Sequence, residues 1–414
     1  MTCRLNYLAF CLVALMAAPA WAGADPVFSD TGPDAGLYGA ADGYPAGPRI
    51  APVPQGFMVG HYSHFDDKYP SRIAARADTP SAWRRADEEL TLEYTFKGVT
   101  YGLNDYLSRH PATGFLIAHG DTILFEHYQY ARTDQDRFLS QSMAKTLVAM
   151  LLGIAVQEGA IASIDQPAAD YVPALAGTEY GKTPIRALLH MASGVAFHEV
   201  YDAPGDNGRL NLMLFGRYNP GPAQAVSMFN TREAPPDTRF NYAGVETEVL
   251  GLVVTAAVKM PLTEYLRTRI WQKMGAEADA AWTIDTTGQE TAFCCVNAVL
   301  RDWARIGMML ANDGAWNGDQ IVPAQWVRDA TTPQSEFQKP GVATRYFGYG
   351  YQVWLFPGPG RRFALLGVHG QAVLVDPVSK LVLVHTAVRM KASQDPAALE
   401  LRALWEALVG KVGG

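Results

Sequence analysis

The sequence is poor in cysteine and shows no excess of positive charge. Its 414 residues include 4 cysteines, and the formal net charge is −7. This charge balance gives no sign of a nucleic-acid-binding protein, which usually carries a basic patch. There is no H-E-x-x-H motif, glycine-rich phosphate loop or set of paired cysteine ligands, so no metal is expected. The 49% hydrophobic and 18% charged residues indicate a soluble globular protein of one large or two modest domains.

The first 22 residues have the pattern of a secretory signal peptide. A short positive start, MTCR, precedes an apolar run too short to span a bilayer comfortably. Small residues at Ala20 and Ala22 then form an A-x-A cleavage pattern. We expect a periplasmic or secreted protein with no stable membrane insertion once residues 1–22 are removed. The alternative is an uncleaved N-terminal anchor.

Signal cleavage would remove Cys3 and Cys11 and leave only the adjacent pair Cys294 and Cys295. An exported chain without a long-range cysteine pair depends on its hydrophobic core for stability. We interpret the remaining pair as two small buried side chains. A vicinal disulfide or a reactive thiol is the alternative.

The order of elements along the chain predicts an α+β fold. Residues 23–88 begin with a stretch rich in Gly, Pro, Ala and Asp and are expected to be an extended lead-in. β-rich segments lie near both ends of the following domain, residues 89–414, and amphipathic helices fill its middle. This order fits an antiparallel sheet built from both ends, flanked by helices, with a mostly helical insertion. The sheet is expected from about 89–135 and 345–414, and the helical region from about 140–335.

The strongest chemical signal is a serine and a lysine three residues apart at the start of an apolar helix. The stretch FLSQSMAKTLVAMLLGIAVQEG, residues 138–159, places Ser142 and Lys145 on one face of that helix. Serine needs a base to become a nucleophile, and a lysine serves as one if burial lowers its pKa. The S-x-x-K pattern alone is weak, because it occurs about once or twice by chance in a chain of this length. The alternative is an ordinary helix start with a solvated lysine.

Two further motifs follow in the order known from one enzyme superfamily. Tyr242 stands in RFNYAGVETEVLG, and His369 stands in GVHGQAVLVD. With S-x-x-K, these elements resemble the serine β-lactamase and penicillin-binding-protein superfamily. Within it, the chain is most similar to the 6-aminohexanoate-dimer hydrolases and related class C-like esterases. The resemblance runs from about residue 90 to the C-terminus and implies serine acyl transfer, which needs no cofactor.

The resemblance implies a role for each motif residue. Ser142 is the expected acylated nucleophile, and Lys145 accepts or relays its proton. Tyr242, as phenolate or through a relay with the lysine, is expected to serve the leaving group and the deacylating water. The backbone amides of Ser142 and Ala372 are expected to form the oxyanion hole.

Further residues are candidates for substrate binding. His369 takes the place of the lysine of the third motif, followed by Gly370 and Gln371. Tyr201, in GVAFHEVYD, corresponds roughly to a loop tyrosine that closes on the substrate in 6-aminohexanoate-dimer hydrolases; a packed loop aromatic is the alternative. Asn297 is expected to cap a helix that begins there, with a second role as a wall of the active site.

Two departures from the superfamily pattern shape the functional prediction. The second motif ends in Gly244 where Asn or Ser is common, and the third motif has no lysine. Both weaken the case for efficient β-lactamase activity. We therefore predict an exported serine hydrolase of small amides or esters. The alternatives are a D,D-peptidase or β-lactamase, and a binding or sensor protein of the same fold without turnover.

Overall fold

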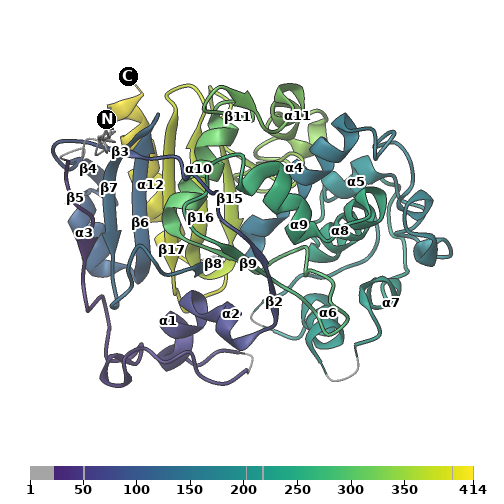
Figure 1. Ribbon diagram of the computed structural model, residues 1–414, viewed down its shortest axis with the longest axis horizontal. Coiled ribbons are helices and arrows are strands. Elements are labelled where there is room, and N and C mark those ends of the chain that lie inside the picture. The colour runs from purple at the N-terminus through teal and green to yellow at the C-terminus, as the bar shows by residue number, and fades with distance from the viewer. Residues whose placement is uncertain (1–22, 50–51, 202, 217–218, 394, 414) are drawn as a thin grey trace, which may run out of the picture.

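Segments from both ends of the chain form the central sheet (Figure 1). The structure is a computed structural model that describes residues 23–413 except 50–51, 202, 217–218 and 394. The expected signal peptide lies outside these residues. Successive antiparallel neighbours in the sheet are β7 (Thr122–Tyr128), β6 (Ala112–His119), β17 (Leu381–Ala387), β16 (Gln371–Asp376), β15 (Phe363–Gly367), β14 (Trp354–Leu355) and β13 (Gly348–Tyr349). The predicted α+β fold, with a sheet from both ends, is confirmed.

Both faces of this sheet are buried. In β6, Phe115 and Ile117 point to one hydrophobic cluster, and Leu116 and Ala118 point to another, as the alternation of a strand requires. One face is covered by α3 (Leu103–Arg109) and α12 (Ala397–Val412). The other is covered by α10 (Leu300–Ala311), behind which lies the helical region. The sheet is therefore the middle layer of an α/β/α sandwich.

The helical region fills the middle of the chain, as predicted. Its helices are α4 (Ala144–Gln157), α5 (Ile185–Leu189), α6 (Asp206–Phe215), α7 (Pro222–Ser227), α8 (Gly244–Val258), α9 (Leu262–Leu266) and α11 (Ala324–Ala330). A second, antiparallel sheet joins this region to the N-terminal part, in the order β2 (Ser71–Ala74), β9 (Ala280–Thr283), β10 (Val296–Ala298) and β8 (Phe138–Leu139). Two small hairpins, β4–β5 (Glu93–Phe96, Val99–Gly102) and β11–β12 (Ala315–Trp316, Asp319–Gln320), complete the fold.

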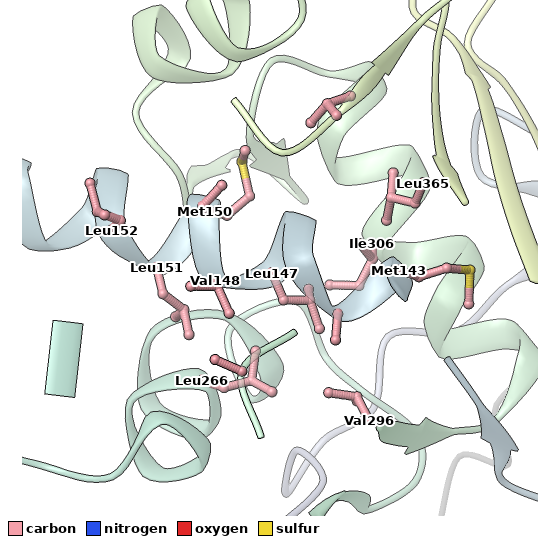
Figure 2. Packing of buried hydrophobic residues seen from close by; sticks show 14 of the residues in the cluster. Met143, Leu147, Val148, Met150, Leu151, Leu152, Leu266, Val296, Ile306 and Leu365 are labelled. Carbon is pink, nitrogen blue, oxygen red and sulfur yellow. The ribbon is translucent and has the colours of Figure 1, made fainter. Parts of the chain in front are cut away.

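Helix α4 passes through the centre of the core. Its apolar side chains project on several sides and meet Leu266, Val296 and Leu365 from different elements (Figure 2). Gly153 is required within this helix because the Trp326 indole takes the space of a side chain there and donates its N–H to the Ala149 carbonyl at 3.0 Å. A helix apolar all round is typical of a core position. This burial holds the start of α4 in a fixed place.

The prediction that residues 23–88 form an extended lead-in outside the domain is wrong. These residues include α1 (Gln55–Ser63), α2 (Phe65–Lys68) and the strands β1 (Val27–Phe28) and β3 (Arg84–Arg85), both parallel to β7. Figure 1 shows α1 and α2 at the lower edge of the view, below the strands. Buried Tyr38, Tyr44 and Tyr62 pack in one cluster with Tyr130 and Leu139 of the domain. The Gly- and Pro-rich composition misled the prediction because tertiary contacts of these aromatic residues order the segment.

Among the described residues, no single helix is long and apolar enough to cross a bilayer. The bent pair Gly244–Val258 and Leu262–Trp271 reaches that length and composition only together. Most residues of both helices are buried in the core.

Candidate active site

The structure brings Ser142 and Lys145 into hydrogen-bonding contact. Ser142 lies in the short 3-10 turn η2 (Gln141–Met143), which leads directly into α4. Lys145, in the first turn of α4, donates from Nζ to Ser142 Oγ at 3.0 Å. The same ammonium donates to the Phe293 carbonyl oxygen at 2.8 Å. The pair that the sequence singled out is therefore an assembled unit and not a solvated lysine beside a helix start.

The burial of Lys145 increases the fraction of its free amine near neutral pH. The side chain is 1% exposed. Burial lowers the pKa of Lys145 to about 8, while the carboxylates of Glu199 and Glu248 raise it. A neutral lysine amine within hydrogen-bonding distance of a serine hydroxyl can accept its proton.

Tyr242 lies just before α8, close to both Ser142 and Lys145. Lys145 Nζ is 5.2 Å from the centre of the Tyr242 ring, which stacks on Trp354 at a centroid distance of 5.2 Å. Burial and the negative charge of Glu199 raise the pKa of Tyr242 well above its usual range, although hydrogen bonding with Ser142 opposes this shift. Tyr242 therefore rests as a neutral phenol that can donate a proton.

The carboxylate of Glu199, to which the sequence assigned no role, contacts the second motif at Gly244. Glu199 accepts hydrogen bonds from the Tyr201 hydroxyl and from the peptide N–H of Gly244, the first residue of α8. A side chain at Gly244 would place its Cβ 3.1 Å from Glu199 Oε2. The carboxylate thus takes the space where the resemblance led us to expect an Asn or Ser side chain. It also lies at the positive end of the α8 dipole, which favours a negative charge.

The third part of the site is the chain around Gly367 and His369. It begins at the end of β15 and packs on the turn before Ser142. A Cβ at Gly367 would lie 2.5 Å from the Ser140 carbonyl oxygen, so only glycine permits this approach. His369 follows with a φ of 61° and makes a 2.7 Å hydrogen bond through Nδ1 with the Arg389 carbonyl oxygen. Its ring meets the edge of Tyr62 from α1 at 5.5 Å. Tyr62 in turn accepts a 3.2 Å hydrogen bond from the Gln141 amide, next to the nucleophile.

Comparison with known proteins agrees with this constellation. Residues 105–404 match the sequence profile of the family described as Beta-lactamase. The chain belongs to the beta-lactamase family. It is a serine hydrolase of that family, with Ser142, Lys145 and Tyr242 assembled at one site.

One curated relative and two solved structures show which members of the family this chain is similar to. The 6-aminohexanoate-dimer hydrolase of Paenarthrobacter ureafaciens is 30% identical over 278 residues, which cover 65% of this chain and 71% of that one. A solved structure of a candidate 6-aminohexanoate-dimer hydrolase from Bacillus anthracis superposes with a TM-score of 0.77 at 22% identity, covering 87% of this chain and 95% of that one. A family VIII carboxylesterase superposes with a TM-score of 0.56 at 17% identity, covering 72% and 93%. The two structures support the fold.

In this beta-lactamase-family protein, three residues predicted from the third motif are held by contacts within the sheet. Ala372 lies in β16 with ladder partners on both sides, Leu366 in β15 and His385 in β17, so its amide is part of the sheet. Gln371 is 2% exposed, and its side-chain amide bonds the Ala387 backbone. Gly370, at a φ of 100°, fits closely against Ala387 and accepts from His385 through its carbonyl. The predicted roles came from counting along the chain from His369, which leads into β16, whereas the end of β15 at Gly367 packs directly on the turn before Ser142.

Asn297 is also misplaced by the sequence prediction. It lies within β10, and α10 begins only at Leu300 with Val299 as its N-cap. The side chain is fully buried and donates to the Ala281 and Cys295 carbonyl oxygens. It neither caps a helix nor lines the site, because a short strand precedes the helix.

The structure corrects the interpretation of the cysteines as well. Cys294 and Cys295 form a vicinal disulfide and do not remain two separate thiols. The bond lies immediately after Phe293, whose carbonyl holds Lys145.

Tyr201 donates its hydroxyl hydrogen bond to Glu199, which also binds the Gly244 N–H, and its predicted role in substrate binding stays a prediction. Sequence reasoning missed the parts played by Glu199, Phe293 and Gly367, since nothing in the chain signals which distant segments meet. The only sequence hint was Gly244, the missing side chain that Glu199 replaces. No group of three His, Cys, Asp or Glu residues in the described part of the chain is arranged to bind a metal ion.

Proposed function

We propose that this protein hydrolyses small amides or esters through an acyl-enzyme on Ser142, in the manner of 6-aminohexanoate-dimer hydrolases. The observation that carries the proposal is the buried Lys145 amine, 3.0 Å from Ser142 Oγ and held by the Phe293 carbonyl. The relative from Paenarthrobacter ureafaciens supports the substrate class.

The arrangement accounts for each proton in the reaction. Ser142 Oγ attacks the acyl carbonyl carbon while its proton passes to the free amine of Lys145. Collapse of the tetrahedral intermediate breaks the bond to the amine or alcohol. Tyr242, a neutral phenol next to Lys145, donates the proton that the leaving group needs. Water then attacks the acyl-enzyme by the reverse path and frees Ser142.

The oxyanion hole needs a second donor beside the Ser142 amide. We place it at the end of β15, where Gly367 touches the turn that carries the nucleophile and Val368 follows outside the strand ladder. Backbone N–H groups at such a position stabilise the developing oxyanion without having to reorganise.

Glu199 argues against the main alternative, a D,D-peptidase or β-lactamase. Such substrates carry a carboxylate, and here a carboxylate already lies at the start of α8. The lysine that would pair with a substrate carboxylate is replaced by His369, whose Nδ1 is committed to the Arg389 carbonyl. A negative group at the site disfavours a substrate of net negative charge, such as a penicillin, relative to a neutral ester or to the zwitterionic 6-aminohexanoate dimer, whose ammonium balances its carboxylate.

We also propose export to the periplasm or beyond, supported by the signal-peptide pattern of residues 1–22. The measurement is the N-terminal sequence of the protein recovered from its native host. A mature chain beginning near Gly23 is expected, and an uncut N-terminus contradicts cleavage.

The test of the activity is product release from the linear dimer of 6-aminohexanoate and, in parallel, from a short p-nitrophenyl ester. Wild type is compared with Ser142→Ala and with the matched control Ser108→Ala, an exposed serine of α3. Loss of turnover only in Ser142→Ala is expected, because removal of an acylated nucleophile costs on the order of 10⁴-fold or more in kcat. Cleavage of the ester alone assigns an esterase, whereas turnover by folded Ser142→Ala contradicts the mechanism.

A further inference from the structure

The vicinal disulfide is joined directly to the peptide that holds the catalytic lysine. The peptide between Phe293 and Cys294 presents its carbonyl oxygen to Lys145 Nζ at 2.8 Å. Its N–H, on Cys294, donates to the Thr291 carbonyl oxygen at 3.3 Å. Because the C=O and N–H of a trans peptide point in opposite directions, the orientation of this one plane decides whether Lys145 has its acceptor.

The neighbouring backbone is fixed on the far side of the disulfide. The Cys294 carbonyl accepts from the Trp282 indole at 3.1 Å. The Cys295 carbonyl accepts from the Thr283 N–H at 3.1 Å. Phe293 itself lies outside β9 and β10, so no strand ladder sets the direction of its carbonyl. The chain must turn sharply here, and Cys295 adopts a φ of 74°, a conformation that non-glycine residues rarely take.

The sulfur atoms are shielded by the N-terminal segment. Cys294 and Cys295 are 6% and 5% exposed, and they pack in the cluster that contains Tyr62 and Phe65. The bond therefore lies inside the wall of the active site, between α1 and the lysine's acceptor.

We propose that the Cys294–Cys295 disulfide is a positioning element for Lys145. By closing a small ring over the turn, it holds the Phe293–Cys294 peptide with its carbonyl directed at Nζ, and its reduction slows acylation of Ser142. This inference rests on the proposed function, because it needs Ser142-dependent turnover to be observed.

The chemical change is a thiol–disulfide exchange with an external dithiol. Dithiothreitol breaks the Cys294–Cys295 bond, leaves two protonated thiols and becomes its own cyclic disulfide. Two electrons and two protons pass to the protein. Freed from the ring, the turn can rotate the Phe293–Cys294 peptide, and Lys145 Nζ loses an acceptor that orients it toward Ser142.

The test uses the full chain with Cys3→Ser and Cys11→Ser, so that only the vicinal pair can react. Reduction is followed by alkylation with iodoacetamide and by intact mass, and kcat and KM are measured with a p-nitrophenyl ester. The double variant Cys294→Ser/Cys295→Ser provides the reduced state without any reagent. It also controls for reagent effects, because dithiothreitol should leave its rate unchanged.

The expected result is a fall in kcat of about 10- to 100-fold, with KM within about threefold, in both the reduced protein and the double serine variant. Reoxidation of the reduced protein should restore the rate. A doubly alkylated protein or a serine variant with the full kcat contradicts the inference, as does a loss of rate accompanied by loss of the folded circular dichroism signal. Absence of Ser142-dependent turnover in the oxidised protein contradicts the proposed function, and the inference with it.

Discussion

At the scale of single residues, the buried amine of Lys145 governs how the site responds to pH. Burial lowers its pKa to about 8, and only the free amine accepts the Ser142 proton. The fraction of free amine grows as pH rises, so kcat/KM for a neutral ester should increase with pH and level off above about 8. The measurement is a pH–rate profile from pH about 6 to about 10. Lys145→Arg, whose guanidinium stays protonated, should be inactive throughout, and a flat wild-type profile contradicts this assignment.

Glu199 sets the position of that profile. Its negative charge raises the pKa of Lys145, so Glu199→Gln should move the rising limb of the profile to lower pH. The variant should also lose activity, because the Gln side chain cannot accept from both Tyr201 and the Gly244 N–H as a carboxylate does. The exposed Glu233→Gln is the matched control and should leave the profile in place. If the rising limb of the pH–rate profile of Glu199→Gln keeps its position or moves to higher pH, the carboxylate does not raise the pKa of Lys145.

At the scale of elements, the core fixes α4, which carries Lys145 and directly follows the turn with Ser142. Gly153→Ala should destabilise the protein by about 1–3 kcal/mol, although alanine favours helices, because the new Cβ would lie 2.4 Å from the Trp326 indole. Gly410→Ala in α12 meets no neighbour and should be neutral or stabilising by about 1 kcal/mol or less. Urea unfolding of the two variants compares them directly. Equal stability would mean that Trp326 moves aside without cost.

The elements also show which parts of the site were predictable. Apolar periodicity located α4, and the helix start placed Ser142 and Lys145 on one face because three-residue spacing is a local property. The positions of Glu199 and Phe293 depend on where distant loops meet α8 and α4, which periodicity does not encode. The third motif shows a related limit. Counting from His369 leads into β16, whereas Gly367, at the end of β15, lies against Ser140 and Gln141 just before the nucleophile.

At the scale of the whole molecule, the N-terminal segment is part of the catalytic domain. Composition suggested an extended lead-in, yet α1 supplies Tyr62, which is 5% exposed and touches both His369 and Gln141. Gln141, with a φ of 47°, directly precedes the nucleophile. Only the packing of the folded chain reveals that this segment reaches the site.

Tyr62→Phe tests this role of the segment. It removes the acceptor of the Gln141 amide, and a fall in kcat of about 3- to 10-fold is expected from one lost hydrogen bond. Tyr44→Phe, in the same cluster but bonded to the Asp30 carbonyl, is the matched control and should retain the wild-type rate. An equal fall in kcat in both variants would show that the loss comes from general destabilisation of the cluster and not from the contact between Tyr62 and Gln141.

The central claim is that Ser142 is acylated with Lys145 as the proton acceptor. Rapid acid quench of the enzyme with a p-nitrophenyl ester, followed by intact mass and peptide mapping, measures this directly. The account predicts one acyl adduct on Ser142 that forms and decays at the rate of turnover, and none in Ser142→Ala or Lys145→Arg. An adduct at another residue, or turnover by folded Ser142→Ala, would contradict it.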